Sequence, residues 1–161
     1  MARTVHLAAE LAAPPAKIFD AYLDPRTHAA ITGAPAVVSP KAGAKFSAFG
    51  GTLSGTILEL VPKSLIVQSW RASHWKNKDS NSILVLSLHP WGRGKTLIDL
   101  VHANVPDHDF AGVSQGGSYI TGHPGATISK EAAAPDSVGL WLNRAGQPIS
   151  ANTDMRSPRW R

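Results

Sequence analysis

Apolar and polar residues follow regular patterns over roughly the first 105 positions. Between residues 4 and 11 every second side chain is apolar, which predicts a strand. Residues 14–25 change to a helical spacing, with two prolines suited to a helix entry and an apolar stripe formed by Ile18, Phe19, Tyr22 and Leu23. Pro25 ends or restarts this helix, and Gly33 is expected to close a second short helix.

The pattern after residue 33 is that of strands. Six runs alternate or are rich in β-branched residues, and turn residues separate them; the runs are 35–39, 44–50, 52–61, 64–73, 80–89 and 95–105. Because the links are short, the strands are expected to form an antiparallel meander. A strand, a helix pair and then a run of strands define an α+β fold.

An apolar sheet face needs a cover, and the N-terminal helix pair is too short to supply it alone. A long amphipathic helix is therefore expected after Val105. Pro106 and Asp107 suit its start, and Phe110 and Val113 have the spacing of one helix face. The apolar stripe stops at Gly116, where glycines and prolines begin to interrupt the chain.

The composition narrows the class of protein. With 161 residues, 43% hydrophobic and 17% charged, the chain is expected to be globular and, up to residue 116, a single domain. It has no cysteine, no apolar run long enough for a membrane span and no secretory signal pattern, so we expect a cytoplasmic protein. The net charge of +5 is scattered without a dense basic run, which argues against nucleic-acid or membrane partners.

Several segments together resemble the SRPBCC, or START-like, superfamily with its helix-grip fold. Within it, the similarity is to bacterial relatives of the activator of the heat-shock protein 90 ATPase. It covers about residues 3–116 and rests on "PPAKIFDAYLDP", "ITGAPAVVSPKAGAKFSAFGGTLSGTILELVP", "LIVQSWRASHW" and "HANVPDHDFAGVSQG". The run from Phe46 to Gly55, the Trp70–Arg71 pair and the Val105–Pro106 turn look especially similar.

The resemblance implies non-catalytic binding of a small hydrophobic ligand in a cavity between the sheet and the terminal helix. The expected lining residues are Phe46, Phe49, Ile57, Trp70, Leu84 and Leu86. Arg71 is expected on the opposite face from Trp70, since neighbours on a strand point apart. A protein client, as for a chaperone-ATPase cofactor, is the alternative partner, and a cyclase- or hydrolase-like enzyme is the third possibility.

No motif identifies catalytic residues, a metal site or a cofactor. "GRGKT" is expected to be a hairpin turn, because a strand follows it where a phosphate-binding loop needs a helix. Capping accounts for Asp107 and Asp109 better than metal binding does. Glu59, Asp99 and His102 are on predicted strands and could point inward as acid–base groups, but an outward orientation is favoured.

Residues 117–161 depart from the family pattern, which calls here for a helix rich in Tyr and Trp. Regrouping the codons from the third base of Gly116 permits W-K-L-Y-Y-W-A-P-W-R-D-Y-L, which resembles that missing helix. We therefore interpret 117–161 as a frameshifted read-through and expect an aberrant, irregular tail and a lost closing helix. Regrouping fixes two of the three bases in each codon and leaves one free, so a natural divergent tail or an extension of the chain is the alternative.

The frameshift interpretation predicts a stability effect. Replacing residues 117–161 by the regrouped helix should raise the melting temperature and reduce binding of an apolar dye, because each large apolar side chain buried contributes roughly 1.5–3 kcal/mol. Resequencing of the gene tests the interpretation directly. A chain that already melts cooperatively at high temperature as a monomer, and gains nothing from the replacement, would contradict it.

Overall fold

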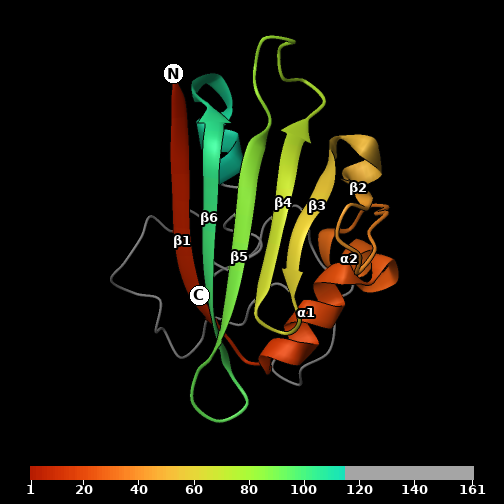
Figure 1. Ribbon diagram of the computed structural model, residues 1–161, viewed down its shortest axis with the longest axis vertical. Helices are drawn as coiled ribbons and strands as arrows, with labels where there is room; N and C mark the ends of the chain where they lie inside the picture. The colour runs from red at the N-terminus through yellow and green to blue at the C-terminus, as the bar shows by residue number, and fades with distance from the viewer. Residues whose placement is uncertain (115–161) are drawn as a thin grey trace.

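A computed structural model describes residues 1–114 of the chain, apart from the side chains of residues 31 and 32. The elements are strand β1 (Ala2–Leu11), helices α1 (Pro15–Leu23) and α2 (Pro25–Thr32), strand β2 (Lys45–Ala48), the 3-10 turn η1 (Phe49–Gly51), strands β3 (Leu53–Val61), β4 (Leu65–Ala72), β5 (Ser82–Pro90) and β6 (Thr96–Pro106), and the 3-10 turn η2 (Asp107–Asp109) (Figure 1). Residues 110–114 are helical. The expectations of an irregular tail and a lost closing helix lie outside the described residues.

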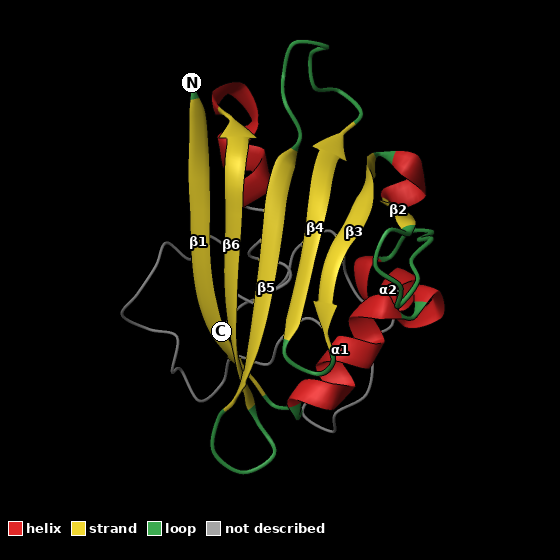
Figure 2. Cartoon of the chain, in the orientation of Figure 1, coloured by secondary structure: helices red, strands yellow, loops and turns green. Residues whose placement is uncertain are grey.

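The strands form one antiparallel sheet in the order β1-β6-β5-β4-β3-β2 (Figure 2). Strands β2 to β6 are joined in chain order, and β1 returns to the far edge beside β6. The predicted α+β class and the antiparallel meander are confirmed. Within residues 1–114 no helix has the length and apolarity that crossing a bilayer requires.

One predicted strand is wrong. Residues 35–39 form no strand, and only Val37 pairs, in an isolated bridge with Ser47. Their two backbone hydrogen bonds are each 2.8 Å long. Pro35 and Pro40 lack the amide hydrogens that a ladder needs, so the run cannot extend this bridge into a strand.

The two helices begin and end where the prolines and Gly33 predict. Pro14 and Pro15 begin α1, and Pro25 begins α2 after a short break at Asp24. The Asp24 carboxylate accepts a 2.7 Å hydrogen bond from the Thr27 backbone and so caps α2, a role that the sequence analysis did not assign to it. Gly33 ends α2 with a φ of 75°.

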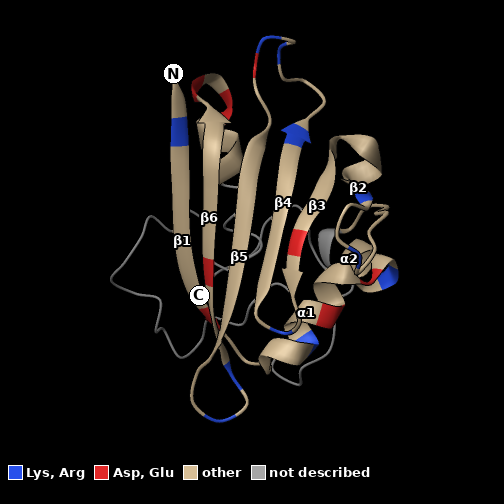
Figure 3. Ribbon diagram, in the orientation of Figure 1, with Lys and Arg blue, Asp and Glu red and all other residues tan. Residues whose placement is uncertain are grey.

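The sheet buries one face and leaves charges at its margins. Alternate residues of β1, β4, β5 and β6 are buried, in agreement with the alternation in the sequence. Lysine, arginine, aspartate and glutamate gather in loops and towards strand ends, and β5 carries none of them (Figure 3). The buried face, called the inner face below, is the side of the sheet on which Tyr22 of α1 contacts Gln68.

Gly55 lies directly between two aromatic residues of the neighbouring strands, in a row of paired residues that runs across the sheet. It pairs with Phe46 on β2 and with Trp70 on β4. A Cβ atom added to Gly55 would lie 1.9 Å from the backbone oxygen of Ser69 and 2.6 Å from Cε1 of Phe46. Only glycine leaves room for the Phe46 ring and the close approach of β4.

Substitution of Gly55 should therefore destabilise the fold. Gly55→Ala is expected to lower the free energy of unfolding by about 1–3 kcal/mol, because the new methyl group meets backbone that cannot turn away. Urea denaturation measures the change. Ser54→Ala, at the exposed neighbouring position, is the matched control. Equal stability of the two variants would contradict this account of the row.

Candidate functional site

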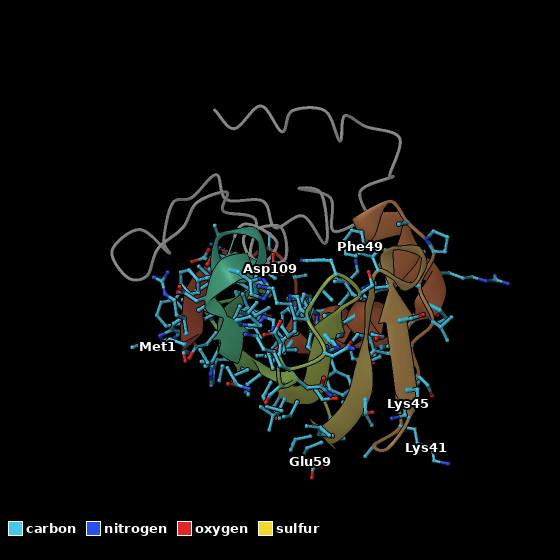
Figure 4. All side chains as sticks on the ribbon, turned by 90° about the horizontal axis from the view of Figure 1, so that it is seen from above. Met1, Lys41, Lys45, Phe49, Glu59 and Asp109 are labelled. Atoms are coloured by element: carbon cyan, nitrogen blue, oxygen red, sulfur yellow. The ribbon has the colours of Figure 1, made fainter. Side chains whose placement is uncertain are left out.

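The inner face is organised in rows of directly paired residues. One row crosses five strands and contains Ile57, Gln68, Leu84, His102 and Val5. Figure 4 shows the strands arranged in an arc, with Glu59 on one side of the sheet and Phe49 and Asp109 towards the other (Figure 4). Directly opposed side chains share a face and have Cβ atoms about 4.5–5.5 Å apart, so the row is continuous.

Five of the six predicted cavity residues lie on this face in three adjacent rows. Ile57 and Leu84 belong to the row just described, Phe46 and Trp70 to the row through Gly55, and Leu86 to the next row on the other side. All but Trp70 are buried, and Trp70 is partly buried. Phe49 is in η1 with 41% of its surface exposed, so the structure does not bring it together with the other five.

His102 points inward, contrary to the outward orientation favoured from sequence. Its Nε2 lies 2.7 Å from the hydroxyl of Ser82, which also lies 3.0 Å from the backbone oxygen of Trp70. A serine hydroxyl has one proton, so Ser82 donates either to the Trp70 oxygen or to Nε2 of His102, according to the tautomer of the imidazole. The Trp70 ring packs edge-on against this imidazole, with centroids 4.9 Å apart.

Burial keeps His102 neutral. The loss of hydration lowers its pKa from 6.5 to about 4. The residue is 4% exposed, and its ring packs against that of Trp70. At neutral pH the site therefore contains an uncharged imidazole.

A second polar group on the inner face joins the sheet to α1. The Tyr22 hydroxyl donates a 3.0 Å hydrogen bond to Oε1 of Gln68, and both side chains are buried. Burial raises the pKa of Tyr22, so its hydroxyl stays protonated. Since Gln68 is the neighbour of Leu84 in the central row, α1 is fixed at a position from which it covers part of that row.

Trp75 closes one end of the inner face. The sequence analysis placed it in a turn, yet it is only 4% exposed and its ring lies 5.4 Å from that of Trp70. Its indole nitrogen donates a 2.6 Å hydrogen bond to Asp109, to which Nε2 of His74 also comes within 3.1 Å. A tryptophan within an otherwise polar turn is the feature of the sequence that could have predicted this contact.

Arg71 supports the loop rather than the inner face. As predicted, it points away from Trp70, and it donates hydrogen bonds to the backbone oxygens of Asp79 (2.7 Å) and Lys76 (2.8 Å). The loop is also held by a 2.8 Å contact between His108 and the Asp79 carboxylate, which lowers the pKa of Asp79. Arg71 is thus occupied by its own chain and is not an anchor for an anionic ligand.

A polar cleft of about 460 Å³ opens beside this loop. It is lined by Met1, Ala2, Lys76, Lys78, Asp79, Ser80, Asn104, Pro106, Asp107 and His108. None of the six predicted ligand residues lines it. The cleft is therefore a feature of the end of the sheet and not the apolar site that the resemblance implies.

The contact between Ser82 and His102 does not have the arrangement of an activated nucleophile. The hydroxyl also lies 3.0 Å from the backbone oxygen of Trp70, which competes with the imidazole for its proton. No carboxylate among the described residues orients the other ring nitrogen, as a triad requires. Residues 1–114 also contain no group of three or more histidines and carboxylates placed to hold a metal ion.

The six-stranded antiparallel sheet with an N-terminal helix pair has the architecture of a START-like domain. The comparisons agree. The model of the family described as "Activator of Hsp90 ATPase homolog 1-like protein" matches residues 12–122, and the chain belongs to this family.

Relatives of known description cover different shares of the chain. The "Activator of 90 kDa heat shock protein ATPase homolog" of Dictyostelium discoideum is 27% identical over 114 residues, which are 71% of this chain and 30% of that protein. The structure of an HSP90 activator from Plasmodium falciparum is 29% identical in sequence and has a TM-score of 0.60. The match covers 64% of this chain and 74% of that one. CalU16 from Micromonospora echinospora shows the same fold at 24% identity, with a TM-score of 0.61. The match covers 73% of this chain and 70% of CalU16.

The buried imidazole predicts a loss of stability in mild acid. Between pH 6.5 and 4 the unfolded chain protonates His102 while the folded chain does not, so the free energy of unfolding falls as the pH falls. The loss attributable to His102 is about 3 kcal/mol, from about 1.4 kcal/mol for each unit of pKa difference. Urea denaturation across this range measures it.

His102→Gln should flatten the pH dependence, because an amide can still donate to Ser82 but does not titrate. His89→Gln, at an exposed position of β5, is the control and should keep the wild-type slope. His28 is also buried and has a lowered pKa, so it adds a loss of stability in acid to the wild type and to both variants alike. An unchanged slope in His102→Gln would show that His102 is not the titrating group.

Proposed function

We propose that this domain binds a small apolar molecule on its inner face without transforming it. The observation that carries the proposal is the composition of that face: three adjacent apolar rows interrupted by two neutral polar groups, His102 with Ser82 and Gln68 with Tyr22. A mostly apolar site with a few placed polar groups is the usual form of a small-molecule site. Phe46, Ile57, Trp70, Leu84 and Leu86 would contact the ligand.

The same groups support binding rather than catalysis. A general base needs a pKa near the working pH, whereas burial lowers that of His102 to about 4. Within residues 1–114, the only side chain with which the Ser82 hydroxyl is shown in contact is this weakly basic imidazole. The polar groups are thus suited to orient a ligand.

A second candidate is docking on a heat-shock protein 90 ATPase. It is supported by the printed descriptions of the Dictyostelium and Plasmodium relatives as activators of that ATPase. The chain spans only 30% of the Dictyostelium protein, so the activity of that whole protein does not transfer with the matched segment. A protein client would use the exterior of the domain and need not compete with a ligand on the inner face.

A paired substitution on β5 tests the first proposal. Leu84 and Val85 are neighbours that point to opposite faces of the sheet. Leu84→Phe should weaken binding of the neutral fluorescent probe N-phenyl-1-naphthylamine roughly tenfold by filling the central row. Val85→Phe should leave binding unchanged. Fluorescence titration measures the affinity, and circular dichroism confirms that both variants are folded.

The outcomes separate the two candidates. No binding by the wild-type chain, or equal loss in both variants, would contradict a site on the inner face. Retention of a purified heat-shock protein 90 ATPase by the immobilised chain, unaffected by Leu84→Phe, would favour docking on that partner.

A further inference from the structure

The polar cleft beside the β4–β5 loop is a cavity that the proposed function does not use. Its volume of about 460 Å³ lies within the range of small-molecule sites, about 300–1,000 Å³. Its lining comes from the start of β1, from the β4–β5 loop and from the segment 104–108. Figure 3 shows this loop at the end of the sheet opposite to the β5–β6 hairpin. Because the lining is polar and charged, the cleft suits a charged ligand.

Contacts within the chain hold the walls of the cleft in place. Arg71 donates hydrogen bonds to the backbone oxygens of Lys76 and Asp79, both of which line the cleft. On the facing segment, the side-chain amide of Asn104 donates a 2.9 Å hydrogen bond to the backbone oxygen of Asn81 in the loop. A site whose walls are already ordered loses less conformational entropy when a ligand binds.

A bulge in β6 places Asn104 at the cleft. Where the pairing of β1 with β6 is irregular, Ala103 and Asn104 of β6 stand opposite the single residue Thr4 of β1. Asn104 has a φ of 63°, in the left-handed region that residues other than glycine seldom occupy. Bulges are frequent next to binding sites, where they redirect a side chain. The strained residue of this bulge lines the cleft, which favours a binding role for it.

The two carboxylates of the cleft already have cationic or hydrogen-bonding partners from the chain. The Asp79 carboxylate lies 2.8 Å from Nε2 of His108, and this contact lowers the pKa of Asp79. The Asp107 carboxylate lies 3.7 Å from the guanidinium of Arg3. A cationic ligand would therefore have to compete with these partners for the negative charge.

The positive charge of the cleft is not matched in this way. Lys76 and Lys78 both line the cleft, and within residues 1–114 neither forms an ion pair. Both residues are exposed, and the flexible four-carbon stem of a lysine allows its ammonium group to turn towards the cleft. Two such charges attract a dianion more strongly than a monoanion. A phosphate monoester is close to a dianion at neutral pH and has three acceptor oxygens.

We propose that the cleft binds a small soluble molecule that carries a phosphate monoester. The phosphate oxygens accept hydrogen bonds from the ammonium groups of Lys76 and Lys78, and the Ser80 hydroxyl is a further donor on the same wall. The volume of the cleft leaves room for the rest of the molecule. This site is separate from the inner face, so the inference goes beyond the proposed function and does not depend on it.

Three probes that share a benzene ring and differ in charge test the ligand class. They are phenyl phosphate, benzoate and benzyl alcohol. Calorimetric titration of the full chain at low ionic strength and about pH 8, where phenyl phosphate is a dianion, should give it an affinity roughly tenfold above that of benzoate. Benzyl alcohol should not bind at the same concentrations.

Two double variants with the same net charge test the location. Lys76→Gln combined with Lys78→Gln should weaken phenyl phosphate binding roughly tenfold. Lys41→Gln combined with Lys63→Gln removes two exposed lysines that do not line the cleft and should keep the wild-type affinity. Figure 4 shows Lys41 on the side of the molecule opposite to Met1, which lines the cleft. Circular dichroism confirms that both variants are folded.

Equal weakening in the two double variants would show that phenyl phosphate follows the net charge of the protein, and would overturn the site. Benzoate binding as tightly as phenyl phosphate would overturn the phosphate class, and no binding of phenyl phosphate would overturn the inference as a whole. Binding of N-phenyl-1-naphthylamine to the inner face should be the same in both double variants and the wild type, so failure of either proposal is recognised separately.

Discussion

The register across the sheet is the constraint on which the other features of the domain depend. It places Ile57, Gln68, Leu84, His102 and Val5 side by side on one face. A slip of one residue in any strand would move that strand's contribution to the opposite face. An irregularity between Ile57 and Glu59 accommodates one extra residue, Leu58, and restores the pairing beyond it. The hydrogen bonds of His102 with Ser82 and of Tyr22 with Gln68 exist only in this register.

At the end of the sheet that carries the β4–β5 loop, side-chain contacts rather than strand pairing hold the segments together. Trp75 and His74 from the β4–β5 loop both meet Asp109 after β6, and Arg71 holds the loop from behind. Arg3 of β1 lies over the Phe110 ring, 3.5 Å from its centroid, and Val113 is buried. These contacts fix the direction in which the chain leaves the sheet and enters the helical residues 110–114. They join β1, the β4–β5 loop and the residues after β6 at this end of the sheet.

The sequence predicted β1 to β6 and the helix pair, because alternation, prolines and Gly33 encode local geometry, but it also predicted a strand at 35–39 that does not form. Its resemblance to the family is confirmed. It also predicted correctly that Trp70 and Arg71 point apart. It did not predict the orientation of His102, because both sets of alternating residues on β6 are mixed: one contains Leu100 and His102, the other Asp99 and Val101. Which set is buried depends on the pairing of β6 with β5 and with β1, and β1 is distant in sequence. Trp75 was missed for a similar reason, since its partner Asp109 is 34 residues away.

The state of His102 is central to the account of the site, and nuclear magnetic resonance measures it directly. Correlation of the His102 ring nitrogens with the ring protons distinguishes the two neutral tautomers and follows protonation with pH. The account predicts a neutral ring at neutral pH with a titration midpoint near pH 4. A midpoint near 6.5 would contradict the inward, desolvated imidazole.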